Sequence, residues 1–286
     1  MIKYVFLAVV VTVIYFFQSF FLPTGGIGAD SLSYFGIASD LPQLKTNLFP
    51  LGFPVLIKIF HFIFQDYFWA GKILNISMVT MILLFSYVKK FYFRETVLLF
   101  AGKTFFFAFN LVISEGPFLF LLYFLFYFFH ERFQNKISSR HFVFYASAIL
   151  ILLFTVRYSG IYIYLGTGVF WLWMLLRRRI FAFQKDLLKV LVVSGAGIIA
   201  YLSFNYFVYG SFTGEHLRGA PARIYPVYVV RNILAMVNII DPFIGIKPAS
   251  NSFVSIAFQV GLMLIDLLLL RYFVKLVKCK KDNLQM

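Results

Sequence analysis

The acidic residue with the clearest chemical potential is Asp30, the first acid after a long apolar run that opens the chain. It follows the glycine-rich stretch 25–28 and begins a segment in which Asp30, Tyr34 and Ala38 recur at helical spacing. A carboxylate at this place could serve as a general base. It could also be a helix N-cap, because aspartate is favoured there and suits the positive end of the helix dipole. The local sequence leaves both interpretations open.

Other charged residues could complete a site around Asp30. Asp40 lies about 15 Å further along the same predicted helix, too far for both acids to act on one bond. Glu115 precedes another apolar run and could contact a substrate, cap a helix or pair with a cation. Arginine suits phosphate because its planar fork binds two oxygens, although any single cation could instead extend to lipid headgroups. The candidate cations are Lys58, His61, Lys72, Arg157, His216, Arg218, Arg223 and Arg231.

The composition indicates that these residues are positioned by helices in a lipid environment. The 286 residues are 62% hydrophobic and only 13% charged, whereas soluble domains carry about 45–50% apolar and about 25% charged residues. A single water-surrounded core of this size could not bury 40 Phe and 18 Tyr. The composition therefore excludes a soluble globular protein, a disordered chain and a free-standing nucleic-acid-binding module, despite a net charge of +15. The single cysteine, Cys279, excludes an internal disulfide.

Long apolar runs predict an all-α integral membrane protein with eight transmembrane helices in one polytopic domain over residues 1–286. The connections expected on the cytoplasmic side hold 17 of the 26 Lys and Arg residues but only four of the 11 acids. By the positive-inside rule we expect both termini in the cytoplasm, and the short chain favours the bacterial inner membrane. The predicted spans lie at about 2–22, 68–88, 96–113, 117–130, 141–157, 160–176, 187–208 and 253–274.

Two long outer connections, 23–67 and 210–252, are expected to lie as interfacial segments on the membrane surface. The first contains the predicted short helix that starts near Asp30. Pro50 and Pro54 are expected to prevent an ordinary helix there, which leaves 55–64 as a re-entrant or interfacial element. The second connection concentrates charged residues: Glu215, His216, Arg218 and Arg223.

Three stretches together resemble the GT-C superfamily of membrane glycosyltransferases, which includes the protein mannosyltransferases and the aminoarabinose transferases of lipid A. The first is Asp30 after the first span, with Tyr34 on the same helix and the Pro-aromatic-Pro segment 50–54 beyond it. The second, Ser114-Glu115-Gly116-Pro117, resembles the turn that opens the fourth helix of that family. The third, Arg157-Tyr158-Ser159-Gly160, resembles its turn between helices five and six. Their order and spacing match over about residues 1–180, and 181–286 hold the remaining helices and the second long outer connection.

This resemblance implies a GT-C-like fold that transfers a sugar from a polyprenyl-phosphate donor to a lipid, glycan or protein acceptor at the outer membrane face. Asp30 would be the general base, and cations would hold the donor phosphate, on which negative charge grows as the glycosidic bond breaks. Some relatives use a divalent cation and others do not, so this cofactor stays open, and no metal-ligand set is evident. The substrate-binding residues would be Tyr34, Lys58, His61, Glu115, Arg157, Tyr158, His216, Arg218 and Arg223.

Other classes of membrane protein share some of these features. A transporter or flippase for a lipid-linked substrate predicts inverted repeats and helices broken at mid-membrane, neither of which the sequence pattern indicates. A membrane protease or transpeptidase needs an outward-facing cysteine, a Ser/His arrangement or an HExxH motif, and the sequence offers none of these on the outer side. A non-catalytic assembly partner that keeps the GT-C-like fold stays open.

Overall fold

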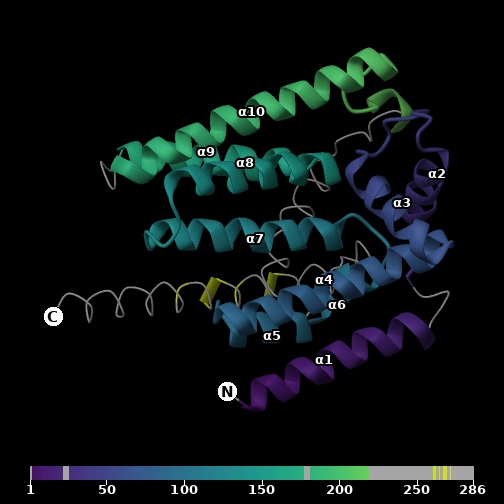
Figure 1. Cartoon of the computed structure of the whole chain (residues 1–286), viewed down its shortest axis with the longest axis horizontal. Helices are drawn as coiled ribbons and strands as arrows, with labels where there is room; N and C mark the ends of the chain where they lie inside the picture. Colours follow the sequence, from purple (N-terminus) through teal and green to yellow (C-terminus); the bar gives the residue numbers. More distant parts are fainter. Residues whose placement is uncertain are drawn as a thin grey trace. The chain divides into compact units, whose positions relative to one another are not determined.

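The computed structural model describes residues 2–21, 26–176 and 181–218, together with 260, 261, 264, 267, 268 and 271. Most of the predicted span 253–274, as well as Arg223 and Arg231, lies outside these residues. The described chain contains helices and no strand: α1 (Ile2–Phe21), α2 (Ala29–Asp40), α3 (Gly52–Phe64), α4 (Tyr67–Lys89), α5 (Phe93–Ala101), α6 (Lys103–Asn110), α7 (Glu115–Phe133), α8 (Ser139–Val156), α9 (Gly160–Leu176), α10 (Phe181–Tyr209) and a 3-10 turn (Glu215–Arg218) (Figure 1).

The chain divides into two compact units. The first comprises residues 1–98 and 107–220, and the second comprises 99–106 and 221–286. The described part of the second unit is mainly the junction of α5 and α6, where the rings of Phe100 and Phe105 meet edge to face at 5.3 Å. All described candidate site residues belong to the first unit.

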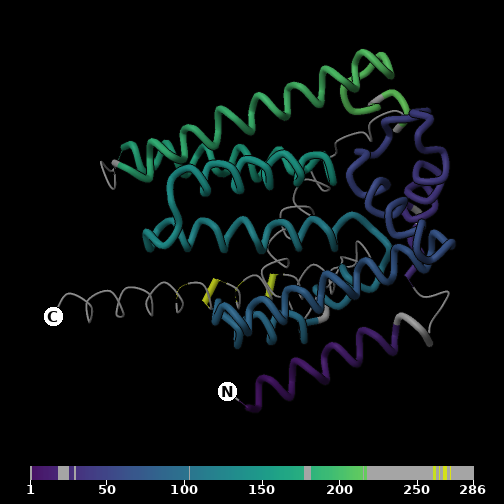
Figure 2. The backbone as a smooth tube through the Cα atoms, viewed as in Figure 1, coloured from purple at the N-terminus to yellow at the C-terminus, as the bar shows by residue number. Residues whose placement is uncertain are grey.

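Within the first unit, α7, α8, α9 and α10 form a bundle around one apolar core (Figure 2). α8 packs most extensively against α7 and α10, α4 packs on α7, and α1 packs on α4. α2 and α3 pack on each other and against α4, at the end of the bundle where α7 begins and α8 ends (Figure 1). We call this the α2 end. The buried core of the bundle comprises Leu125, Phe142, Ala146, Ile149, Leu150, Leu153, Met174, Phe183, Leu187 and Val190.

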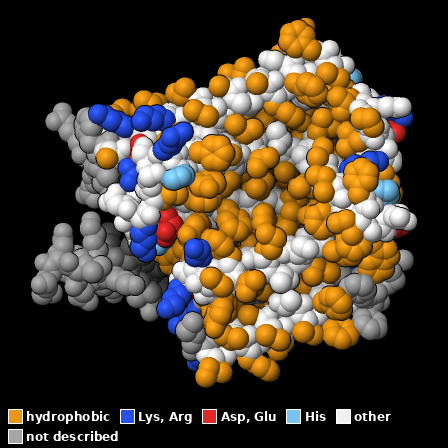
Figure 3. All heavy atoms as spheres, viewed as in Figure 1, with side chains coloured by type: hydrophobic (Ala, Val, Ile, Leu, Met, Phe, Trp, Pro, Cys, Tyr) orange, Lys and Arg blue, Asp and Glu red, His pale blue; other side chains and the backbone are white. Residues whose placement is uncertain are grey.

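Many large apolar side chains lie on the outside of these helices, as a lipid environment requires. Figure 3 shows hydrophobic side chains spread across the visible face, with Lys and Arg gathered mainly toward one end. By length and hydropathy, three described helices (α4, α8 and α10) could cross a membrane, and α6 with α7 could add a fourth as one broken span. The helices α1, α3 and α9 are apolar but shorter over their described lengths.

The all-α prediction is therefore confirmed for the described residues, whereas the count of eight spans is not. The predicted span 96–113 is interrupted, because α5 ends at Ala101 and α6 ends at Asn110. α6 and α7 are then bent by 119° across a short break at residues 111–114. The predicted boundary between the spans 96–113 and 117–130 lies close to this break. The interruption between α5 and α6 was not predicted, because apolar residues lie on both sides of it and hydropathy does not report where backbone hydrogen bonds stop.

The prediction that Pro50 and Pro54 together prevent a helix was wrong for Pro54. α3 begins at Gly52, so Pro54 lies in its first turn, where a missing N–H removes no intrahelical hydrogen bond. Glycine is needed at 52 because a Cβ there would lie 2.6 Å from the carbonyl oxygen of Thr155. The close approach lets α3 pack against the end of α8.

Candidate functional site

The start of α2 is capped without Asp30. Gly28 occupies the N-cap position, its N–H donates to Oγ of Ser31 at 2.9 Å, and the N–H of Ser31 donates to the carbonyl of Gly28 at 3.0 Å. Asp30 is an exposed residue in the first turn of the helix. A negative charge is favourable in that turn, and the carboxylate is not used as the N-cap.

The start of α2 is hydrogen-bonded to the break between α6 and α7. The N–H of Val112 donates to the carbonyl of Gly26 at 2.8 Å, and its carbonyl accepts from Oγ of Ser31 at 2.7 Å. The amide of Asn75 in α4 donates to the carbonyl of Leu111 at 2.8 Å. Backbone groups released by the broken helix are therefore bound by side chains and backbone of other elements, which fixes the start of α2 against α7.

A buried lysine lies beneath the same entry to α2. Lys72 in α4 is 1% exposed, and its Nζ lies 5.0 Å from the ring centroid of Phe68. Gly26 has a φ of 121°, and a Cβ there would lie 2.7 Å from the carbonyl oxygen of Asn110 and 3.1 Å from Nζ of Lys72. Glycine is required by both the conformation and the space. Lys72, predicted as a possible surface cation, is instead buried beside Gly26.

Tyr34 connects α2 to the first residues of α7. Its side chain is 2% exposed, and its ring packs against Phe49 at 4.7 Å and against Phe53 of α3 at 4.9 Å. Its hydroxyl donates to Oγ of Ser114 at 2.9 Å. Tyr34 is therefore held rigidly one helical turn beyond Asp30, with its polar tip at the break before α7.

Four neighbouring residues, Asp30, Ser114, Glu115 and Arg157, influence the pKa of Tyr34. The pKa of Tyr34 is raised to about 12, mainly by burial; the hydrogen bond with Ser114 lowers the pKa, and the negative charges of Glu115 and Asp30 raise it. The positive charge of Arg157 lowers the pKa. The phenol consequently stays protonated at neutral pH and remains a hydrogen-bond donor, in a field to which both carboxylates and the guanidinium contribute.

An ion pair closes the site between α7 and α8. Arg157 is the C-cap of α8, and its Nη1 pairs with Oε1 of Glu115 and lies 3.4 Å from Oγ of Ser114. The side chains of Arg157 and Glu115 are 39% and 41% exposed. These contacts of Arg157 use only Nη1, so its Nε and Nη2 hydrogens form a fork suited to two oxygens of a phosphate.

Gly160 fixes the turn that presents Arg157. Its N–H donates to the carbonyl of Arg157 at 2.8 Å, and α9 begins at this residue. A Cβ at 160 would lie 2.6 Å from both the carbonyl carbon and the carbonyl oxygen of Leu153. The arginine and the glycine of the 157–160 motif are thus linked, since the close turn places the guanidinium beside α7.

Tyr158, which was predicted to bind substrate, is hydrogen-bonded within an internal network. Its hydroxyl donates to the carbonyl of Asn47 at 3.0 Å and accepts from the amide of Asn205 at 3.2 Å. The amide of Asn47 in turn donates to the carbonyl of Ser211 at 2.8 Å. Asn47 and Asn205 were not predicted from the sequence, although a lone Asn in the apolar α10 was a usable signal for Asn205. The network ties the connection between α2 and α3 to the end of α10.

The remaining predicted residues do not join this cluster in the described chain. Lys58 donates to the hydroxyl of Tyr67 at 3.0 Å, and His61 stacks on that ring at 3.9 Å, which forms a separate group at the junction of α3 and α4. His216 is exposed in the 3-10 turn. The side chain of Arg218 and the whole of Arg223 lie outside the described residues.

The site as described is a convergence of Asp30, Tyr34, Ser114, Glu115 and Arg157. Among the described residues, no group of three or more His, Cys, Asp or Glu side chains is arranged to hold a metal ion. Comparison of the chain with protein-family models, with curated proteins and with solved structures gave no match. Function must therefore be inferred from this arrangement and from the resemblance of its motifs.

Proposed function

We propose that the protein is a GT-C-type membrane glycosyltransferase, which transfers a sugar from a polyprenyl-phosphate donor to an acceptor on the outer face of the membrane. The observation that carries this proposal is the convergence at the α2 end of a carboxylate in Asp30, a neutral phenol in Tyr34 and a half-exposed guanidinium in Arg157. A base and a phosphate-binding cation are the two groups that such a transfer requires.

In this proposal, Asp30 accepts the proton of the acceptor hydroxyl or amine as that atom attacks the anomeric carbon with inversion. The bond between the anomeric carbon and the phosphate oxygen breaks, and its electron pair leaves with the lipid phosphate. The free fork of Arg157 stabilises the growing charge on that phosphate, and Glu115 orients the guanidinium through the ion pair. The exposure of Asp30 leaves room for an acceptor beside it.

We also propose the finer topology expected from the charge distribution, with eight spans and both termini in the cytoplasm. The α2 end would then lie at the outer face, since it follows the first span and precedes the α4 span. Single cysteines at Leu32 and Asn135 test this with a membrane-impermeant reagent. Leu32 is the outer position because it is 63% exposed, whereas its neighbour Ser31 is buried. Labelling of an Asn135→Cys protein from outside would contradict the orientation.

One observation favours a transporter for a lipid-linked substrate as the second candidate. The 119° bend between α6 and α7 is a broken helix of the kind that transporters use for substrate binding. However, the backbone of Val112 within the break is occupied by Gly26 and Ser31. The break therefore holds α2 in place, which supports the enzyme over the transporter.

The decisive experiment compares Asp30→Asn with Asp40→Asn in the full chain reconstituted in proteoliposomes. Asp40 is a matched control because it lies on the same helix and pairs only with exposed Lys45 at 2.8 Å. Radiolabelled polyprenyl-phosphate sugars and a membrane lipid and glycan extract would serve as donors and acceptors. We expect Asp30→Asn to lower turnover about 10²–10⁴-fold, because removal of a general base has an effect of that size, and Asp40→Asn to leave turnover within twofold.

Two results would contradict the proposal. Wild-type turnover in a well-folded Asp30→Asn protein would remove the general base. Movement of the labelled lipid across the bilayer, with no transfer of any sugar by the wild-type protein, would establish the transporter instead.

A further inference from the structure

A second candidate binding site lies at the opposite end of α4 from α2. The connection between α4 and α5, together with the end of α7, borders an open hollow of about 410 Å³. Its wall consists of residues 90–95 and His130. All of these residues belong to the first unit, and none belongs to the glycosyltransferase site proposed above.

The hollow is rich in positive charge. Of its seven lining residues, Lys90, Arg94 and His130 are basic and Glu95 is acidic. Lys90 and Arg94 are exposed, so neither charge is neutralised by burial against a partner. The guanidinium of Arg94 lies 5.4 Å from the ring centroid of Tyr4 in α1, which restricts its position through a cation–π contact.

The backbone of the connection that carries these cations has a defined conformation. Lys90 is the C-cap of α4 in a left-handed conformation, with φ of 51°, and Tyr92 has φ of 45°. The N–H groups of Lys90 and Phe91 both donate to the carbonyl of Ser86, at the end of α4. Residues other than glycine rarely adopt a positive φ angle. The hydrogen bonds to the end of α4 therefore stabilise this conformation against the intrinsic backbone preference of these residues.

The floor of the hollow is aromatic and packed. Phe91 is 9% exposed, and its ring lies 5.2 Å from His130 and 5.6 Å from Tyr123 of α7. The ring of Tyr92 lies 5.5 Å from that of His130 and 5.0 Å from that of Phe91. The hollow is therefore formed by mutually packed rings without a ligand, which lowers the ordering cost of binding.

Apolar surface adjoins the charged hollow. Leu84 and Val88 on α4 are 61% and 64% exposed, and Tyr87 between them is 43% exposed. These residues share one helix face, because they are separated by three and four positions. The ring of Tyr87 contacts the lining residue Phe93 at 5.3 Å. An apolar strip therefore leads from the wall of the hollow along a helix that could cross the membrane.

We infer that this hollow binds the phosphate group of an anionic phospholipid, with an acyl chain lying along the strip formed by Leu84, Tyr87 and Val88. Lys90 and Arg94 contact the phosphate oxygens, and the first turn of α5 adds backbone N–H groups that favour an anion. Basic pockets beside membrane helices are known to bind lipid headgroups in this way. A free phosphate shares the same headgroup chemistry but would make no use of the apolar strip.

The test uses the purified full chain in detergent micelles, with bound phosphatidylglycerol counted by native mass spectrometry. The variant Lys90→Asn/Arg94→Gln removes both charges, and Asn tolerates the left-handed conformation at 90. The charge-preserving variant Lys90→Arg/Arg94→Lys checks that folding is intact. The control Lys136→Gln/Arg140→Gln removes two exposed charges from another connection of the same predicted side. Phosphatidylcholine and inorganic phosphate are the comparison ligands.

We expect the neutralised pair to weaken phosphatidylglycerol binding at least tenfold, whereas the charge-preserving variant and the control stay within threefold of the wild type. Equal losses in the neutralised pair and the control would overturn the site, because they would show only a general charge effect. Equal binding of phosphatidylcholine would also overturn it. Binding of inorganic phosphate without phosphatidylglycerol would overturn the assignment to a lipid. Loss of binding in the charge-preserving variant would overturn the role of charge.

Discussion

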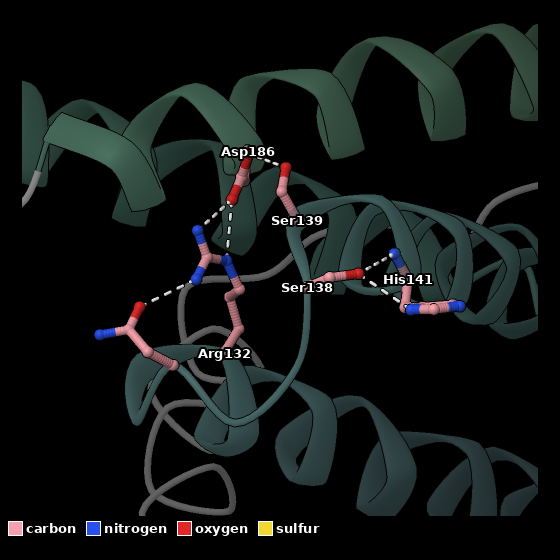
Figure 4. A network of polar contacts seen from close by, with 6 residues as sticks. Arg132, Ser138, Ser139, His141 and Asp186 are labelled. Carbon is pink, nitrogen blue, oxygen red and sulfur yellow. Dashed lines mark hydrogen bonds and ion pairs between the residues drawn. The ribbon is translucent and has the colours of Figure 1, made fainter.

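Two ion pairs at opposite ends of the bundle differ in their burial and in how many of their nitrogen and oxygen atoms form polar contacts. At the α2 end, Arg157 and Glu115 are 39% and 41% exposed and pair through one nitrogen. At the other end, the side chains of Arg132 and Asp186 are 12% and 5% exposed. Oδ2 of Asp186 accepts from Nε of Arg132 at 2.8 Å and lies 2.7 Å from its Nη2 (Figure 4).

The buried pair makes further hydrogen bonds through its remaining nitrogen and oxygen atoms. Nη1 of Arg132 donates to Asn135 at 2.9 Å, and the other carboxylate oxygen of Asp186 accepts from Ser139 (Figure 4). All three nitrogens of Arg132 are therefore engaged, and the pair joins α7, α8 and α10. Among the described contacts, Arg157 uses only Nη1, which leaves its Nε and Nη2 hydrogens available at the surface. The difference indicates that the buried pair holds the scaffold together, whereas the exposed pair can accept a ligand.

The largest expected effect is on stability, from Asp186→Ala. This change leaves the charge of Arg132 buried without its partner, which should lower the free energy of unfolding by about 3–5 kcal/mol. Glu115→Ala breaks the exposed pair and should cost less than about 1 kcal/mol. Reversible chemical unfolding in detergent micelles measures both. Similar losses for the two variants would refute the distinction between the two ion pairs.

The turn that presents Arg157 can be tested through two glycines of α9. A Cβ at Gly160 would lie 2.6 Å from backbone atoms of Leu153, so Gly160→Ala should cost about 1–3 kcal/mol through overpacking. Gly166 has open space around its Cβ position, and Gly166→Ala should gain up to about 1 kcal/mol from helix propensity. Thermal unfolding compares them. A Gly160→Ala protein as stable as the Gly166→Ala protein would contradict the close turn.

Arg157→Lys should reduce sugar transfer nearly as much as Arg157→Ala, by tenfold or more, which corresponds to about 1.4 kcal/mol in the activation barrier. The reason is that lysine offers a point charge instead of a fork. Lys45→Ala is the control, because it breaks another exposed ion pair, with Asp40, outside the site. Initial rates in proteoliposomes measure the effect. Unchanged turnover in both Arg157 variants would remove this residue from the site.

The smallest expected effect is the alkaline response of Tyr34→Phe. At pH 8 the loss of the hydrogen bond to Ser114 should lower the free energy of unfolding of the Tyr34→Phe protein by about 1 kcal/mol. The pKa of Tyr34 is raised from 10.0 to about 12, so between these values the unfolded chain loses the proton and the folded chain keeps it. The wild type therefore loses stability as pH rises above 10, by about 1.4 kcal/mol per unit.

Phenylalanine cannot ionise, so this loss is absent from the Tyr34→Phe protein. We expect its deficit at pH 8 to largely disappear at pH 11, as measured by thermal unfolding of both proteins at the two values. A constant difference between wild type and variant would show that the phenol is not shielded in the fold.

Much of the helical layout follows from the sequence, because hydrogen bonds within a helix and the need for an apolar surface are local. The predicted run 160–176 coincides with α9 (Gly160–Leu176), and the run 68–88 differs from α4 (Tyr67–Lys89) by one residue at each end. The placement of Asp30 and Tyr34 on one short helix was also predictable, since their spacing of four residues fixes a shared face.

The contacts between these elements were decided only by the tertiary structure. Hydropathy placed a turn close to the break at 111–114, but it could not show that the backbone of this break is hydrogen-bonded to Gly26, because that bond joins residues far apart in the chain. Nor did it predict that Arg157 would pair with Glu115, since both lie in short polar turns whose neighbours depend on how α7 and α8 pack. The sequence alone determined which residues form helices and which are polar at their ends. Packing decided which polar ends meet, because contact energies between distant residues appear only once the helices are assembled.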